Sequence, residues 1–89
     1  MRLATSERVV LELLAADGPS YGLQLVTGSR GRLKRGGIYV TLGRMEEKGL
    51  VTSTAGESGR RTYRPTALGE RALLAAQFFA GGVQLGAKS

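Results

Sequence analysis

The chain has 89 residues, with 13 Lys and Arg against 7 Asp and Glu, a formal net charge of +6, and neither Cys nor His. This length suits one small domain, which buries roughly 60–65% of its unfolded surface. Because Cys and His are lacking, the sequence excludes disulfides, thiolate or imidazole metal sites and the commonest catalytic groups, so we expect no metal, no cofactor and no enzymatic activity.

Two helices are predicted at the start of the chain. Apolar residues recur at helical spacing after the capping signal Thr5-Ser6-Glu7, which predicts a first helix over residues 5–16. The helix-breaking run Asp17-Gly18-Pro19 then ends it. Ser20 is placed to cap a second, short helix over residues 21–27.

The third predicted helix lies within residues 35–48. Ile38, Leu42 and Met45 fall on one face, at the i, i+4, i+7 spacing of an amphipathic helix with a buried stripe. Gly49 follows as the expected left-handed glycine at the C-terminal end. The opposite face carries short or cationic residues and could lie close against a partner. These residues are Gly36, Gly37, Val40, Gly43 and Arg44.

The apolar period then changes from 3.6 to 2. Residues 51–54 and 61–64 are short β-prone runs on either side of the glycine-rich connection 55–60, which predicts a two-stranded hairpin. Val51 and Tyr63 are expected to point inward. The fold class is therefore mainly α with a small β-hairpin (α+β).

Thr66 is placed to cap a final helix over about residues 67–80. One face, with Leu68, Ala72, Ala75 and Phe79, is expected to cover the core. Leu74 and Phe78 form a second apolar row, which would either complete the monomer core or remain exposed as an interface. We predict a homodimer that uses this helix, with Leu74, Phe78 and Phe79 at the contact. The domain would span residues 1–80, and 81–89 would be a flexible tail.

The positive charge is confined to one segment. Residues 30–64 contain nine basic residues against three acidic ones, and the rest of the chain balances. Segregated charge indicates a polyanionic partner, of which nucleic acid is the obvious candidate. No apolar run approaches the ~18 residues of a membrane span, and the N-terminus lacks a signal peptide. We therefore expect a cytoplasmic protein with no membrane partner.

Three stretches carry a resemblance to a known family. They are the Tyr-Gly pair at 21–22, the pattern Gly-x-φ-Tyr-x-x-Leu-x-x-φ-Glu-x-x-Gly-Leu-φ over 36–51, and Arg-x-x-Tyr-x-x-Thr-x-x-Gly over 60–69. Together they resemble the PadR family of transcriptional regulators across roughly residues 6–76. The resemblance implies a winged helix-turn-helix with three helices, a two-stranded wing and a C-terminal helix. In that architecture the third helix enters the major groove of DNA and the wing follows the phosphate backbone.

The resemblance also implies that Tyr39 contacts DNA, although packing on the flank of the helix is an alternative. Where the family usually has Ser-Pro before the third helix, this chain has Lys34-Arg35, so no side chain caps the helix and two glycines there suit a phosphate. We expect Arg44 to read a guanine edge or a phosphate, and Val40 to pack on a thymine methyl group. The predicted DNA-binding residues are Lys34, Arg35, Gly36, Gly37, Tyr39, Val40, Thr41, Arg44, Arg60 and Arg61.

The sequence leads to a regulator that binds double-stranded DNA as a homodimer and represses transcription by excluding polymerase. The sign of regulation follows from the family resemblance alone. Two alternatives remain open at this stage: a winged helix used for protein–protein assembly, and a basic RNA-binding domain. The operator sequence and any small-molecule effector cannot be read from the residues.

Overall fold

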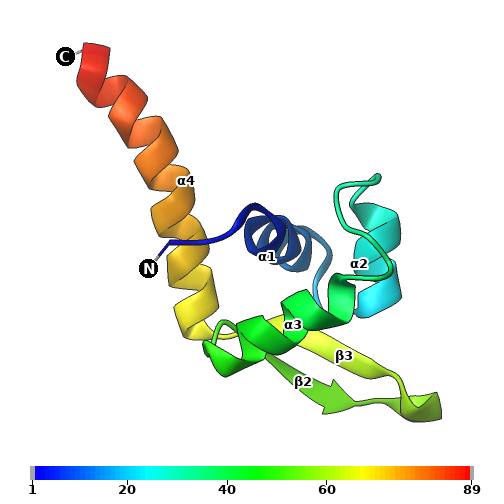
Figure 1. Cartoon of the computed structure of the whole chain (residues 1–89). Coiled ribbons are helices and arrows are strands. Elements are labelled where there is room, and N and C mark those ends of the chain that lie inside the picture. Colours follow the sequence, from blue (N-terminus) through cyan, green and yellow to red (C-terminus); the bar gives the residue numbers. More distant parts are fainter. Residues whose placement is uncertain (1, 89) are drawn as a thin grey trace.

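The computed structural model describes the backbone of residues 2–88 and the side chains of residues 2–56 and 58–78. It is an α+β fold, as predicted, with four α-helices and a small antiparallel sheet (Figure 1). Its elements are α1 (Thr5–Asp17), β1 (Ser20–Tyr21), α2 (Gly22–Gly28), α3 (Ile38–Glu47), β2 (Val51–Ala55), a 3-10 turn (Glu57–Gly59), β3 (Arg61–Pro65) and α4 (Ala67–Lys88).

Helix α1 lies at the centre of the molecule, between α4 on one side and α2 on the other (Figure 1). It contacts α2, α3, α4 and β3, so it is buried on more than one side, with Val9, Val10, Leu11 and Leu14 in the core. Its predicted hydroxyl cap is wrong. The N-cap residue is Ala4, whose N–H donates to the carboxylate of Glu7 (2.9 Å).

The sheet has three strands in the order β1-β3-β2. The prediction contained only the hairpin of β2 and β3 and did not include β1. Strand β1 is only two residues long, and it pairs Ser20 with Tyr63 and Tyr21 with Thr62. Ser20 therefore does not cap α2. The N-cap is Tyr21, and its N–H donates to the side-chain oxygen of Gln24 (2.9 Å).

The prediction for α3 is confirmed at both its buried face and its C-terminal end. Ile38, Leu42 and Met45 are all buried. Gly49 adopts a φ of 78°, which favours glycine. The N–H of Leu50 donates to the carbonyl of Met45 (2.8 Å) and the N–H of Gly49 to that of Glu46 (3.0 Å), the hydrogen-bond pair of a Schellman motif.

Helix α4 begins as predicted, because the Thr66 hydroxyl accepts the N–H of Gly69 (3.0 Å). Ala72 is buried as predicted, but the rest of the core face differs, since Leu73 is buried whereas Leu68 is 41% exposed. The cause is Gly69, whose backbone packs directly against the Leu50 carbonyl and turns this side of the helix inward.

The backbone of α4 is helical through Lys88, past the predicted end near Ala80. Flexibility of residues 81–89 stays a prediction, and the side chains from Phe79 onward lie outside the described residues. None of the helices in the described part of the chain is long and apolar enough to cross a membrane.

Candidate nucleic-acid interface

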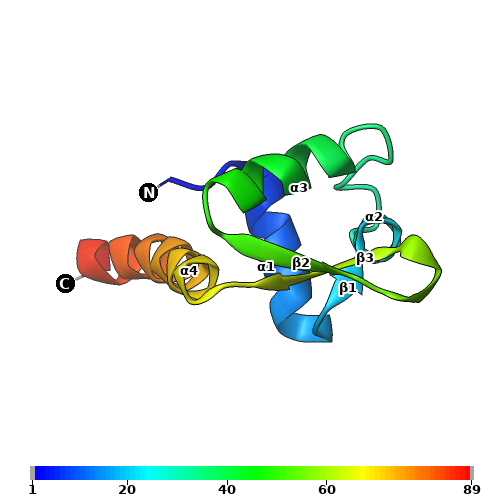
Figure 2. The ribbon, with the colours of Figure 1, turned by 90° about the horizontal axis from the view of Figure 1, so that it is seen from below.

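The outer face of α3 is exposed along its length. Tyr39 and Val40 are 54% and 57% exposed, Arg44 is exposed and Thr41 is half-buried. Val40 and Arg44 lie opposite the buried stripe, and Tyr39 and Thr41 lie on its two flanks, as the period of the helix predicts. The hairpin of β2 and β3 runs beside α3, and its tip extends beyond the helices in both views (Figure 1, Figure 2). The helix and the hairpin tip can therefore contact one extended partner together.

The residues before the N-terminal end of α3 are basic or glycine, and no side chain caps the helix. Lys34, Arg35, Gly36 and Gly37 are all exposed, and no side chain hydrogen-bonds to the N-cap end. The N–H of Ile38 donates to the Lys34 carbonyl (3.0 Å), while among the described residues nothing accepts from the next two amides of the helix. Free N–H groups and the positive end of the helix dipole both favour an anion here.

Tyr39 packs against a neighbouring helix and is also exposed to solvent. The edge of its ring lies against the backbone of Gly22 in α2, so that a Cβ at residue 22 would lie only 2.8 Å from Cε1 of the ring. More than half of the Tyr39 side chain is nevertheless exposed. The ring is thus supported by α2 on one side and available to a partner on the other.

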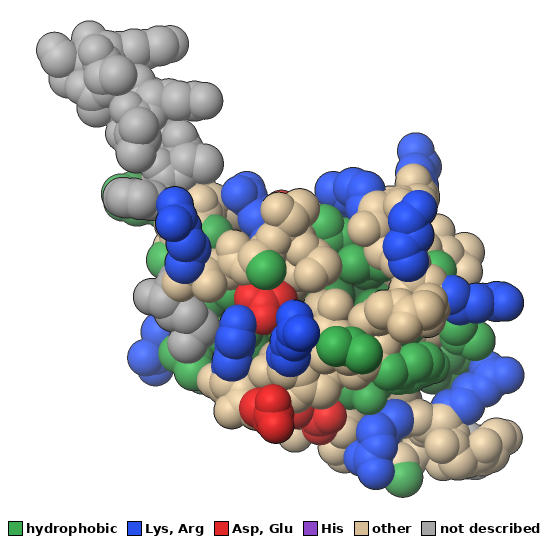
Figure 3. All heavy atoms as spheres, viewed as in Figure 1, with side chains coloured by type: hydrophobic (Ala, Val, Ile, Leu, Met, Phe, Trp, Pro, Cys, Tyr) green, Lys and Arg blue, Asp and Glu red, His purple; other side chains and the backbone are tan. Residues whose placement is uncertain are grey.

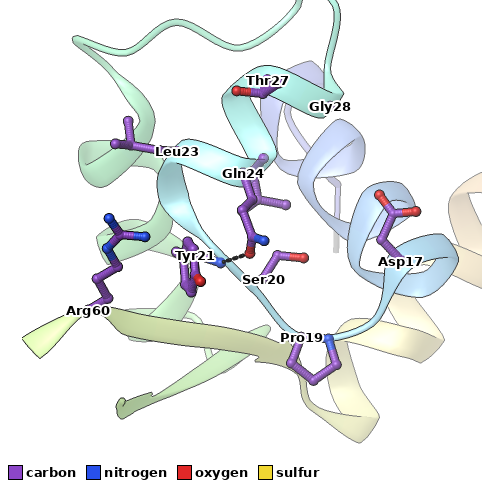
Figure 4. A pocket seen from close by; sticks show the side chains of 10 residues that line it. Asp17, Pro19, Ser20, Tyr21, Leu23, Gln24, Thr27, Gly28 and Arg60 are labelled. Carbon is purple, nitrogen blue, oxygen red and sulfur yellow. Dashed lines mark hydrogen bonds between the residues drawn. The ribbon is translucent and has the colours of Figure 1, made fainter. Parts of the chain in front are cut away.

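The two adjacent wing arginines point to different partners. The guanidinium of Arg60 lies over the ring of Tyr21, 5.0 Å from its centroid, as Figure 4 shows from the side of α2. Nη1 of Arg61 instead donates to the hydroxyl of Ser53 on β2 (3.1 Å), which in turn donates to the carboxylate of Glu46 in α3 (2.7 Å). Both arginines remain exposed, but each is held by a different part of the protein.

A hollow of about 400 Å³ separates the hairpin tip from the helices. Tyr63 forms part of its wall but is itself buried, as predicted, with 5% of its side chain exposed. Burial, and next the nearby Glu46 carboxylate, raise the pKa of the Tyr63 hydroxyl above its ordinary value. The phenol therefore stays neutral at physiological pH. The hollow is lined by Tyr21, Leu23, Tyr39, Gly59, Arg60, Arg61 and Tyr63.

Lys and Arg side chains are spread over the face that contains α3 and the hairpin, with few acidic groups between them (Figure 3). The basic residue Lys48 forms an ion pair within the protein. Nζ of Lys48 pairs with the buried carboxylate of Glu7 at 2.7 Å. Burial raises the pKa of this carboxyl, but the Lys48 hydrogen bond, the Ala4 N–H and the charges of Lys48 and Arg44 together hold it below its ordinary value.

The family model for the transcriptional regulator PadR-like family matches residues 10–75 of the chain. The chain belongs to the PadR-like family of transcriptional regulators. This is a class of regulators and not of enzymes. Among the described residues no group of acidic side chains could hold a metal ion.

Solved structures of transcriptional regulators share the fold of this chain. A PadR family regulator from Clostridium difficile R20291 is 25% identical, with a TM-score of 0.78, over 91% of this chain and 92% of its own. A transcriptional regulator from Clostridium thermocellum is 23% identical (TM-score 0.68), over 92% of this chain and 89% of its own. One from Pseudomonas aeruginosa is 21% identical (TM-score 0.78) over 92% of this chain, which spans only 62% of that protein. The curated proteins offer no match.

The C-terminal helix of this PadR-like chain presents the predicted second apolar row. Leu74 and Phe78 are 64% and 76% exposed, so this row does not complete the monomer core. A groove of about 620 Å³ runs between α4 and α1 beside Leu74. The predicted interface role of Phe79 falls on a side chain outside the described residues.

Sequence reasoning missed the partners that hold the PadR-like wing. Tyr21, Ser53 and Glu46 are absent from the residues predicted to act at the site. A Tyr in a strand of two residues has no periodic signal, and a Ser on the hairpin is an ordinary surface residue. Only the register of the sheet brings these side chains next to the arginines.

Proposed function

We propose that this PadR-like protein is a sequence-specific repressor that binds double-stranded DNA as a homodimer. Helix α3 would enter the major groove, and the hairpin would follow the phosphate backbone. The observation that carries the proposal is the exposed outer face of α3, where Tyr39, Val40 and Arg44 lie beside the basic hairpin tip. Residues 34–37 precede this face and supply cations for a phosphate, and the free amides of Tyr39 and Val40 lie at the start of the helix.

Contacts at this surface divide into those that read the sequence and those that hold the backbone. We propose that Arg44 and Val40 face base edges, with Thr41 and Tyr39 beside them. The phosphate contacts come from the N-terminal end of α3 and from the wing. They are proposed to be Lys34, Arg35, Gly36, Gly37, Arg60 and Arg61.

The test is selection of bound fragments from random duplex DNA, followed by titration of the selected duplex at several salt concentrations. We expect Val40→Ala to change the preferred sequence, whereas Lys34→Ala weakens all sequences about equally and flattens the salt slope by ~1. Arg71→Ala, on α4, is the matched control and leaves the slope unchanged. Competition by single-stranded RNA at equal strength, or binding that does not depend on salt, would contradict the proposal.

Dimerisation is proposed through the exposed row of α4. An apolar row with Phe78 at 76% exposure is costly for a monomer in water, and two copies that pair along α4 would cover it. Such a dimer would present two α3 helices to half-sites about one DNA turn apart, roughly 34 Å. Sedimentation at micromolar concentration should give a dimer for the wild type and a monomer for Phe78→Glu. Leu68→Glu, elsewhere on the same helix, is the control, and a wild-type monomer would refute the interface.

Repression itself is tested by transcription in vitro from a promoter that contains the selected site. The protein should lower transcript yield in proportion to site occupancy, and Val40→Ala should lose this effect at the same site. An increase in transcript yield would identify an activator instead. We also propose that the protein acts in the cytoplasm.

A further inference from the structure

We propose that Tyr21 is a positioning residue for DNA binding, which holds the wing arginine Arg60 ready for a phosphate by stacking beneath it. The guanidinium carbon of Arg60 lies 5.0 Å from the centroid of the Tyr21 ring, within the range of a cation–π contact (Figure 4). This role rests on the proposed DNA-binding function, and it concerns a residue outside the face of α3.

Tyr21 is well placed to act as a fixed support, because its backbone is held from two sides. It pairs with Thr62 in the sheet through strand β1, and its N–H donates to the side chain of Gln24 as the N-cap of α2. The backbone that carries the ring therefore keeps a defined position relative to both β3 and α2. The wing loop is closed beside it, since the N–H of Gly56 donates to the Arg60 carbonyl (2.6 Å).

The chemistry of stacking leaves Arg60 available to a partner. A guanidinium stacks through its flat face, so its five N–H donors remain at the edge of the plane. Within the described part of the chain, no acceptor hydrogen-bonds to the Arg60 side chain, whereas its neighbour Arg61 donates to Ser53. Arg60 is thus ordered without using its donors, and an ordered side chain loses less rotamer freedom when a phosphate binds.

Arg60 lies where the hairpin tip faces the helices. Together with Tyr39 of α3, it lines the hollow of about 400 Å³ between the hairpin tip and the helices. The stack therefore fixes the wing relative to α2, the helix against which the ring of Tyr39 also packs. One support, α2, orients both a residue of the recognition helix and a residue of the wing.

The test compares Tyr21→Leu with Tyr21→Phe, which keeps the ring, by fluorescence anisotropy on a duplex of 30 base pairs of random sequence. We expect Tyr21→Leu to weaken binding by about two- to five-fold and Tyr21→Phe to bind like the wild type. In an Arg60→Ala background the change to Leu should have no further effect. Arg60→Lys keeps the charge but stacks poorly, so it should match Tyr21→Leu and retain the wild-type salt slope.

A second readout does not depend on DNA. In the free protein, the δ-CH₂ protons of Arg60 should be shifted upfield by the ring of Tyr21, and this shift should vanish in Tyr21→Leu and persist in Tyr21→Phe. If the wild type fails to bind the duplex, the proposed function is wrong, whatever the NMR spectrum shows. If the wild type binds and Tyr21→Leu binds equally well, only the positioning role is overturned. The same conclusion follows if the change of Tyr21 to Leu also weakens binding in the Arg60→Ala background.

Discussion

Gly69 lies where α4 contacts the turn after α3, and replacing it by alanine should destabilise the protein, although helix propensity alone would favour alanine. A Cβ at Gly69 would lie far inside van der Waals contact distance of the Leu50 carbonyl oxygen, 3.0 Å from the carbonyl carbon and 3.3 Å from Cδ2 of Leu11. Backbone cannot move aside as a flexible side chain can. Gly69→Ala must therefore push α4 away from this turn, and the hydrogen bond from the Thr66 N–H to the Leu50 carbonyl (3.0 Å) weakens with it.

The magnitude follows from three terms. Overpacking of this kind costs about 1–3 kcal/mol, and the weakened hydrogen bond adds roughly 0.5–1.5 kcal/mol. Replacement of glycine by alanine inside a helix returns about 0.5–1 kcal/mol. The middle values of these ranges combine to about 2 kcal/mol, so we expect Gly69→Ala to lower the free energy of unfolding by about this amount.

Gly43→Ala provides the matched control, because nothing lies within 4 Å of a Cβ at Gly43 in α3. This variant should gain the propensity term alone, about 0.5–1 kcal/mol of stability. Urea unfolding followed by circular dichroism measures both variants, at several protein concentrations so that any association is separated from folding. A Gly69→Ala protein as stable as the wild type would refute the packing described at Leu50.

Three further predictions follow from buried or crowded groups. The pKa of Glu7 is lower in the folded protein than in the unfolded chain, so its pair with Lys48 stabilises the fold above the unfolded pKa. This stability is lost as the pH falls through the folded pKa. Glu7→Gln should therefore make the free energy of unfolding depend less on pH below about pH 5. Ser29→Ala should cost about 1–3 kcal/mol in urea unfolding, because its fully buried hydroxyl accepts a buried backbone N–H (2.9 Å). Gly22→Ala should leave stability nearly unchanged but weaken DNA binding measured by anisotropy, because the new methyl group displaces the exposed ring of Tyr39. In a Tyr39→Ala background, Gly22→Ala should have no effect on binding.

Elements set by nearby residues could be predicted from the sequence. The buried stripe of α3, its left-handed Gly49 and the Thr66 cap each depend on residues within four positions, and the structure contains all three. The hairpin followed from the alternation around a glycine-rich turn. The exposed outer face of α3 followed from the same helical period as its buried face. The central part of the candidate site could therefore be predicted from the sequence.

Features set by distant partners could not be predicted in this way. Strand β1 has two residues and exists only because β3 lies beside it, so no periodicity marks it. The buried side of α4 is chosen by a close approach to the Leu50 carbonyl, and the apolar pattern of α4 fits more than one face. The separate supports of the wing arginines depend likewise on the register of the sheet.

The packing of Tyr39 on Gly22 explains why the Tyr-Gly pair and the pattern of the third helix occur together in this chain. Any side chain at position 22 would occupy the space of the ring, so the glycine of one motif is a steric requirement of the tyrosine of the other. The preceding residue, Tyr21, supports Arg60 from the same place in the fold. Sequence motifs that look independent along the chain are in this way parts of one surface, built around the start of α2.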